Sequence, residues 1–201
     1  IGLKNPGINW LIEQADGRID ISDKIVSVFG FNDNEWFGLF KKCQLLKPLA
    51  IELNISCPNV LKQDANTNVF ALAKDMLKHC DIIVKLPPIN YCELALAAAA
   101  NGLLSFHACN TMPTPLGGFS GKALFYPAIT ATKWLRTNIP KCTIIGGGGI
   151  TTSADAKQFI NAGANKIAIG TMLFWPLNWL RVAKIEQIVT KLTSLKCVSS
   201  N

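Results

Sequence analysis

Two glycine motifs in the last third of the chain are the residues best suited to bind a ligand. Gly146-Gly147-Gly148-Gly149 follows a short apolar run, and Gly170-Thr171 follows the next such run along the chain. Glycine lets backbone N–H groups approach an anion, and helix N-termini favour negative charge. Because both motifs stand just before a helical pattern, we predict a site for a phosphate-bearing ligand. The alternative is ordinary turn chemistry, since glycine is common in any tight strand-to-helix loop.

Asn54, near the end of the apolar run Ala50–Ile55, is predicted to form a second part of this site. Alternation along a strand directs every second residue to the same face. It therefore sends Glu52 and Asn54 into the interior and turns the apolar side chains toward covering helices, these being Ile51, Leu53 and Ile55. An inward amide at the end of a strand is well placed to bind a ligand.

Cys57 comes directly after that run, on the loop Ser56-Cys57-Pro58-Asn59. A thiol at this place could act as a nucleophile or as a proton acceptor. Cysteine is also among the most often buried residues, where it is inert. Position alone leaves both interpretations open.

Lys85 lies near the end of the otherwise apolar run Ile82–Leu86, and Asn110 and Thr111 close the next run. A charge among apolar residues is costly unless a polar ligand meets it or the side chain reaches the surface. We expect Lys85, Asn110 and Thr111 to face the ligand. His107 has the opposite parity to Asn110, so we expect it to point at the helices. With no third partner for a histidine, we predict no metal site.

The elements that must position these residues alternate between strand and helix patterns. Six short runs predict strands at Ile25–Phe29, Ala50–Ile55, Ile82–Leu86, Leu103–Ala108, Thr143–Gly146 and Lys166–Gly170. The intervening patterns predict helices near Glu35–Cys43, Phe70–His79, Tyr91–Ala100, Leu124–Thr137 and Ser153–Ala162, and a last one from about Leu177 to Leu195. Strands separated by single helices predict right-handed βαβ units and a parallel sheet. The Pro/Gly-rich segment Met112–Gly118 is expected to be an active-site loop.

The composition excludes several classes of protein. The chain has 201 residues, of which 49% are hydrophobic and 16% charged, so it is not disordered. Its net charge of +7 comes from lysines spread without a run and only three arginines, which argues against nucleic-acid binding. The most apolar stretch, Leu94–Leu104, is too short to span a membrane. Seven cysteines without a CxxC pair indicate a reducing compartment, so we expect a cytoplasmic protein.

Taken in order, the motifs resemble the dihydroorotate dehydrogenases, flavoproteins of pyrimidine biosynthesis. The matching segments span nearly the whole chain: Ile1–Gly7, Ser27–Gly30, Asn54–Asn59, Lys85–Pro88, Asn110-Thr111, Gly117–Gly121, Ile145–Ile150 and Ile169–Thr171. Position 57 is a cysteine, whereas the membrane-bound class carries serine there. In this respect the chain resembles the soluble class 1. The resemblance implies one FMN-dependent domain over residues 1–201, folded as part of a (β/α)8 barrel.

The resemblance also implies roles for individual residues. Cys57 would remove the C5 proton of (S)-dihydroorotate while a hydride passes from C6 to the flavin. The substrate would be held by Gly2, Leu3, Asn54, Asn59, Asn110 and Thr111. The residues implied to bind FMN are Asn54, Lys85, Gly121, Gly148, Gly149, Gly170 and Thr171. A homodimer is usual in the family, and some members pass electrons through an iron–sulfur subunit.

The chain departs from the family pattern at its start. Only six of the eight βα units of a barrel can be counted, and the family residues of the first two strands are not found. We therefore expect those two units to be missing, and residues 1–201 alone not to form a competent barrel. Two alternatives stay open: a flavin domain like that of dihydropyrimidine dehydrogenase, whose pattern usually has histidine in place of Asn59, and a non-catalytic remnant.

Overall fold

The computed structural model describes residues 5–15, 17–55, 68–76, 78, 80–114, 117–174 and 178–198. In this part of the chain six parallel strands form one curved sheet in the order β1-β2-β3-β4-β7-β8. Their bounds are β1 (Ile25–Val28), β2 (Ala50–Leu53), β3 (Asp81–Leu86), β4 (Ser105–Ala108), β7 (Thr143–Gly147) and β8 (Lys166–Ala168). All neighbours pair in parallel, and β1 and β8 are the two edges of the described sheet.

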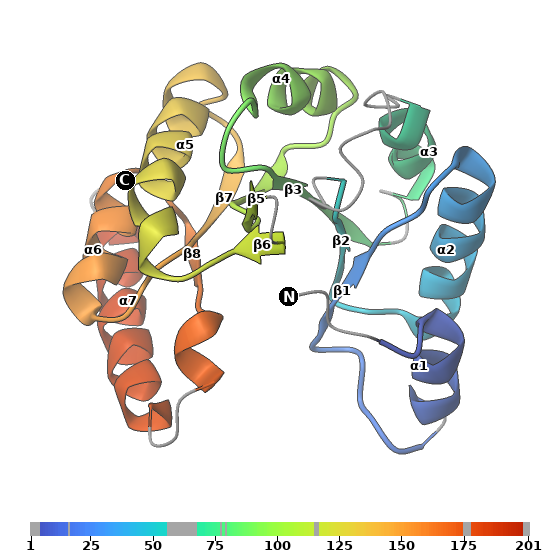
Figure 1. Ribbon diagram of the computed structural model, residues 1–201, viewed down its shortest axis with the longest axis horizontal. Coiled ribbons are helices and arrows are strands. Elements are labelled where there is room, and N and C mark those ends of the chain that lie inside the picture. Colours follow the sequence, from blue (N-terminus) through green and yellow to red (C-terminus); the bar gives the residue numbers. More distant parts are fainter. Residues whose placement is uncertain are drawn as a thin grey trace.

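Helices cover the convex face of the sheet, so that the strands line the inside of an arc (Figure 1). Their bounds are α1 (Ile8–Ala15), α2 (Asp33–Leu46), α3 (Asn68–Met76), α4 (Cys92–Ala100), α5 (Phe125–Asn138), α6 (Ser153–Asn161) and α7 (Trp179–Val198). Two short 3-10 helices, η2 (Lys122–Leu124) and η3 (Thr171–Phe174), follow β6 and β8. The predicted fold class, a barrel-type parallel α/β protein with six βα units, is confirmed.

Two features were not predicted. Residues Ile8–Ala15 form α1, which packs against α2. The expected active-site loop contains an antiparallel hairpin of β5 (Met112–Thr114) and β6 (Gly117–Phe119). Its strands are only three residues long and carry proline and glycine, so the segment has no strand-like alternation that could have indicated it.

The main core lies between the sheet and the helices. The side chains that alternation sends outward, such as Ile51, Leu53 and Phe106, are fully buried there. The concave face has a smaller apolar layer made of Ala50, Ile83 and Ile145. Each fully buried aliphatic side chain contributes roughly 1.5–3 kcal/mol, so the outer layer holds the strands in register.

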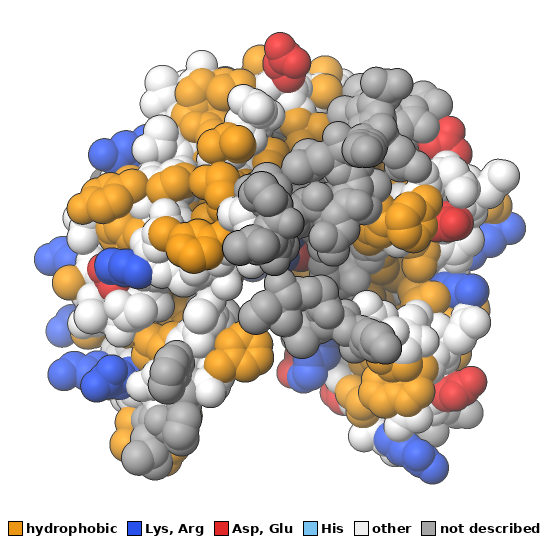
Figure 2. All heavy atoms as spheres, viewed as in Figure 1, with side chains coloured by type: hydrophobic (Ala, Val, Ile, Leu, Met, Phe, Trp, Pro, Cys, Tyr) orange, Lys and Arg blue, Asp and Glu red, His pale blue; other side chains and the backbone are white. Residues whose placement is uncertain are grey.

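The concave face becomes polar toward the carboxyl ends of the strands. Residues of the same parity as the inner apolar layer are Ser27, Glu52, Lys85, His107 and Gly147. Five neighbouring strands thus carry inward polar or small residues, with Ser27 in register with Glu52 and Lys85 in register with His107. Figure 2 shows the molecule hollowed between two lobes at the bottom of the view, with lysine and arginine side chains mainly along the outer left and right edges of the molecule.

Candidate functional site

A cavity of about 400 Å³ opens at the carboxyl ends of β3, β4, β7 and β8. In parallel α/β proteins ligands bind at this end of the strands. Eight of the residues predicted to bind substrate or cofactor line the cavity: Lys85, Asn110, Thr111, Gly121, Gly148, Gly149, Gly170 and Thr171. The structure therefore brings together motifs that are up to 86 positions apart, from Lys85 to Thr171.

The glycine turn after β7 places its backbone close to the segment before η2. Gly149 has φ +66°, and a Cβ there would lie 2.8 Å from the carbonyl oxygen of Gly121. Gly148, with φ +132°, is equally confined to glycine-like conformations. By contrast, a Cβ on Gly170 would meet nothing within 4 Å. The two loops thus form a cradle that is closed on one side and open on the other.

Helix α6 begins directly after this cradle with a capping box. The Thr152 side chain accepts from the N–H of Asp155, and Asp155 accepts in return from the Thr152 N–H at 3.0 Å. Lys122 Nζ donates to the Asp155 carboxylate at 2.7 Å. Burial works to raise the pKa of Asp155, but these donors outweigh it and lower the pKa from 3.8 to about 2. The carboxylate thus ties η2 to the glycine turn.

Cationic side chains dominate the charged part of the cavity lining. Lys85, Lys122 and Arg181 line it, and the described lining contains no aspartate or glutamate. Such a field favours an anionic ligand. The sequence did not predict that Lys122 and Arg181 line the cavity. Both lie in helices, and which side of these helices faces the cavity depends on tertiary packing.

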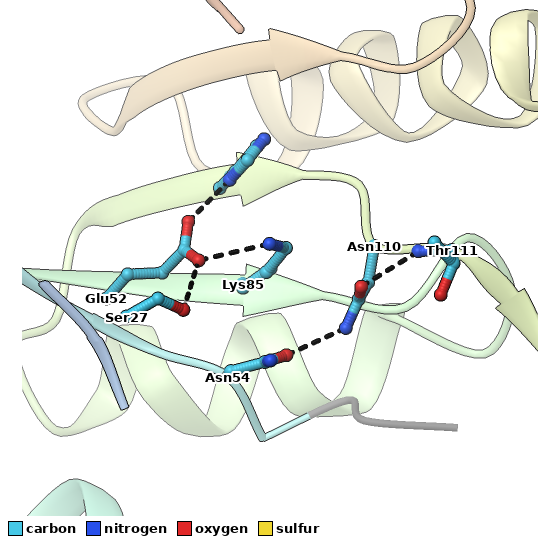
Figure 3. Close-up of polar contacts among 7 residues, drawn as sticks. Ser27, Glu52, Asn54, Lys85, Asn110 and Thr111 are labelled. Atoms are coloured by element: carbon cyan, nitrogen blue, oxygen red, sulfur yellow. Dashed lines mark hydrogen bonds and ion pairs between the residues drawn. The ribbon is translucent and has the colours of Figure 1, made fainter. Parts of the chain in front are cut away.

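The two predicted asparagines contact each other beside the cavity. Asn110 Nδ2 donates to Asn54 Oδ1 at 2.7 Å, and Asn110 Oδ1 accepts from the N–H of Thr111 at 2.9 Å (Figure 3). Asn110 is buried, with 8% of its surface exposed. The expectation that Asn54 turns inward is confirmed.

Glu52 stands at the centre of a polar cluster on the concave face. Its Oε1 accepts from Ser27 Oγ at 2.7 Å and from Lys85 Nζ at 3.1 Å (Figure 3). Its Oε2 lies 2.6 Å from His107 Nδ1. Burial alone would raise the pKa of Glu52; the hydrogen bond and charge of His107, with Lys85 and Ser27, lower it from 4.5 to about 2.

The prediction that His107 points at the helices is wrong. His107 pairs in register with Lys85 and lies on the concave face, where it lines the cavity. Strand β4 ends at Ala108, so the alternation does not extend to Asn110, from which the parity had been counted. The inward parity of His107 follows instead from Phe106 and Ala108, which are fully buried on the helix side.

Four predicted site residues lie outside the described part of the chain: Gly2, Leu3, Cys57 and Asn59. Another cysteine, Cys109, does line the cavity. Burial raises the pKa of its thiol to about 12, partly opposed by the charge of Lys85. A thiol with so high a pKa is protonated at neutral pH and is a poor base or nucleophile.

The described residues contain no group of three or more His, Cys, Asp or Glu side chains that could hold a metal ion. Nor does any helix there combine the length and apolar character needed to cross a membrane. The five cysteines that can be described are all free thiols.

A parallel strand–helix arc with a cationic cavity over glycine turns defines a barrel-type α/β protein whose cavity suits an anionic ligand. The family model "Dihydroorotate dehydrogenase" matches residues 1–193, and the chain belongs to the dihydroorotate dehydrogenase family. It is 32% identical over 199 residues to the catalytic subunit of dihydroorotate dehydrogenase B (NAD(+)) of Lachnoclostridium phytofermentans. It is 30% identical over 203 residues to dihydroorotate dehydrogenase A (fumarate) of Lactobacillus delbrueckii subsp. bulgaricus. The resemblance to class 1 is confirmed.

These alignments cover 87% of this chain and 66% of each relative. The chain thus spans just under two thirds of the length of these curated relatives. Among solved structures, ligand-free dihydroorotate dehydrogenase of Eimeria tenella matches with a TM-score of 0.64 and 18% identity. That match covers 93% of this chain and 63% of the other, and it supports the fold alone.

Proposed function

We propose that this chain carries the site of an FMN-dependent dihydroorotate dehydrogenase, which oxidises (S)-dihydroorotate to orotate in pyrimidine biosynthesis. The observation that carries the proposal is the cavity, where the glycine cradle, Lys85 and the Asn54–Asn110 pair meet at the ends of parallel strands. Family membership supports the same reaction.

The residues present fit a phosphate-bearing cofactor. Gly149 leaves no room for a side chain, and Gly170 opens onto free space where a backbone N–H can approach a ligand. In the proposal Gly121, Gly148, Gly149, Gly170 and Thr171 hold FMN, with Lys85 and Asn54 at its ring. Bound there, FMN would supply the acceptor for the hydride from C6 of the substrate.

The substrate side of the proposal rests on asparagines and one thiol. Asn54 and Asn110 would present their amides to the carboxylate and ring amides of dihydroorotate, together with Thr111 and Asn59, and with Gly2 and Leu3 through their backbone. Cys57 would remove the proton from C5. Cys109, the cysteine that lines the cavity, is not proposed for this role, because burial raises the pKa of its thiol to about 12 and keeps it protonated at neutral pH.

The proposal extends to the electron acceptor and the partners of the chain. The two relatives above bear names that specify NAD(+) and fumarate, so both acceptors are candidates here. We propose a homodimer in a cytoplasmic setting, with an iron–sulfur electron-transfer subunit if NAD is the acceptor. We further propose that residues 1–201 belong to a single barrel domain.

An anaerobic titration tests the proposed function. Protein expressed from its complete coding sequence is titrated with dihydroorotate while the flavin absorbance is recorded. We expect a yellow protein that bleaches as substrate is added, because hydride transfer reduces the flavin.

Uracil and its reduced form are the control substrates. A yellow protein that responds to dihydrouracil and not to dihydroorotate would favour the dihydropyrimidine dehydrogenase-like alternative. A yellow protein that responds to neither would contradict the substrate, and a colourless protein would contradict FMN binding and favour the remnant.

A further inference from the structure

The Glu52 cluster holds a cavity-lining side chain that the proposed function leaves without a role. His107 lies one strand away from Lys85, in register with it, and both side chains bond to the same carboxylate. Neighbouring strands are about 4.8 Å apart, so the two nitrogen-bearing side chains stand next to each other on the cavity wall. His107 is largely buried, with 16% of its side chain exposed.

Glu52 decides which nitrogen of the His107 ring carries a proton. An ionised carboxylate can only accept hydrogen bonds. The pKa of Glu52 is about 2, so it is ionised at neutral pH, and Nδ1 of His107 at 2.6 Å must be the donor. The hydrogen bonds of Ser27 and Lys85 to Oε1 hold the carboxylate in place. Nδ1 is thus committed to Glu52.

The second ring nitrogen of His107 lies close to Gly147, on the neighbouring strand of the cavity wall. A Cβ on Gly147 would stand 3.2 Å from His107 Nε2, so a side chain at position 147 would crowd this nitrogen. Both residues line the cavity, as does Lys85. The cavity wall therefore presents an ammonium group and an imidazole Nε2 side by side, the pattern that recognises the polar edge of a planar heterocycle.

We propose that His107 Nε2 is a further ligand contact of this cavity, bonding the polar edge of the flavin ring beside Lys85, and that Glu52 is the residue that positions it. The inference rests on the proposed function for the identity of the ligand. The orientation of the ring follows from Glu52 whether or not a flavin is bound.

Two substitutions test the roles of the two ring nitrogens of His107 separately. The amide of asparagine occupies the place of Nδ1, so His107→Asn keeps the contact with Glu52 and loses the one in the cavity. Glutamine reaches the place of Nε2, so His107→Gln should restore it. One hydrogen bond of this kind corresponds to about a two- to tenfold change in affinity. We expect His107→Asn to weaken FMN binding by about that factor and His107→Gln to stay within about twofold of the parent protein.

Nitrogen-15 spectra of the histidine ring give a readout independent of activity, assigned by loss of the signal in His107→Gln. We expect a protonated Nδ1 and an unprotonated or exchanging Nε2 in the free protein, and a shift of the Nε2 signal when FMN is added. Glu52→Gln should release the ring to the other tautomer, whereas Ser27→Ala, which keeps the carboxylate and its bond from Lys85, should not. If Glu52→Gln does not fold, the parent spectrum decides the tautomer.

A yellow protein whose His107 signal ignores FMN, or whose affinity is unchanged in a folded His107→Asn variant, overturns the inference and leaves the proposed function intact. A proton on Nε2 with Nδ1 unprotonated overturns the role of Glu52. A protein that binds no FMN overturns the proposed function, and with it the ligand assigned to His107.

Discussion

At the level of single residues, the proposed chemistry depends most on Cys57. We predict that Cys57→Ser slows flavin reduction by dihydroorotate strongly and leaves FMN bound. Loss of a general base costs about 10²- to 10⁴-fold, and a serine hydroxyl is a much weaker acid than a thiol at neutral pH. Stopped-flow absorbance measures the rate, and the visible spectrum reports the bound flavin.

The matched control is Cys109→Ser, at the cysteine that lines the cavity with a pKa of about 12. Its thiol is protonated in the parent protein, so this change should not impose the general-base loss. An unchanged reduction rate in Cys57→Ser would remove Cys57 from the mechanism.

Glu52 is expected to make the stability of the folded protein depend on pH in the acid range. Its pKa falls from 4.5 in the unfolded chain to about 2 in the folded one, despite burial, because of His107, Lys85 and Ser27. A lowered folded pKa contributes stability above about pH 4.5, which is lost as the pH falls toward 2. The shift corresponds to about 3 kcal/mol.

We therefore predict that the denaturant midpoint of the parent protein falls between about pH 4.5 and 2, and that Glu52→Gln flattens this fall. Asp155→Asn should remove a separate part of the same fall, since its pKa is also lowered to about 2. Equal pH slopes for Glu52→Gln and the parent would show that the carboxylate is not held as described.

At the level of elements, the loops after β7 and β8 are expected to respond differently to the same substitution. Gly149→Ala places a Cβ 2.8 Å from the Gly121 carbonyl oxygen and forces alanine to φ +66°, so it should lower stability by about 1–3 kcal/mol. Gly170→Ala finds open space and should leave the unfolding midpoint nearly unchanged. Both should weaken FMN binding if the cradle holds its phosphate.

Thermal unfolding and FMN fluorescence titration measure the two effects separately. Equal destabilisation by the two alanines would contradict the close approach at Gly149. Unaltered FMN affinity in a folded Gly170→Ala protein would instead place the phosphate elsewhere.

The elements also show how far the sequence alone could predict this site. Strand order and the inward facing of Glu52 and Asn54 follow from apolar runs and alternation, because the convex face is a continuous core. The facing of His107 was missed because the parity was counted from Asn110, beyond the end of β4. Lys122 and Arg181 reach the cavity through the packing of η2 and α7, which no local pattern encodes.

At the scale of the whole molecule, the described sheet is an open arc whose edges are β1 and β8 (Figure 1). An edge strand presents unpaired backbone groups that can pair with another chain, and inward charges discourage such pairing. The β8 edge carries the exposed Lys166, whereas β1 carries Ile25 with 46% of its surface exposed. The β1 edge is therefore the less protected of the two.

We predict that a protein made of residues 1–201 alone self-associates and is not a competent barrel, and that Ile25→Lys reduces the association by charging the β1 edge. Light scattering after size-exclusion chromatography measures the mass over a range of concentrations. The control is Leu104→Lys, which charges a similarly exposed position, 41% against 46%, just before the central strand β4. Because β4 already has a partner on each side, that change should leave the association as it is. If residues 1–201 give a soluble, monodisperse and active protein, the open edges are tolerated. If the two lysine substitutions have equal effects, association does not proceed through β1.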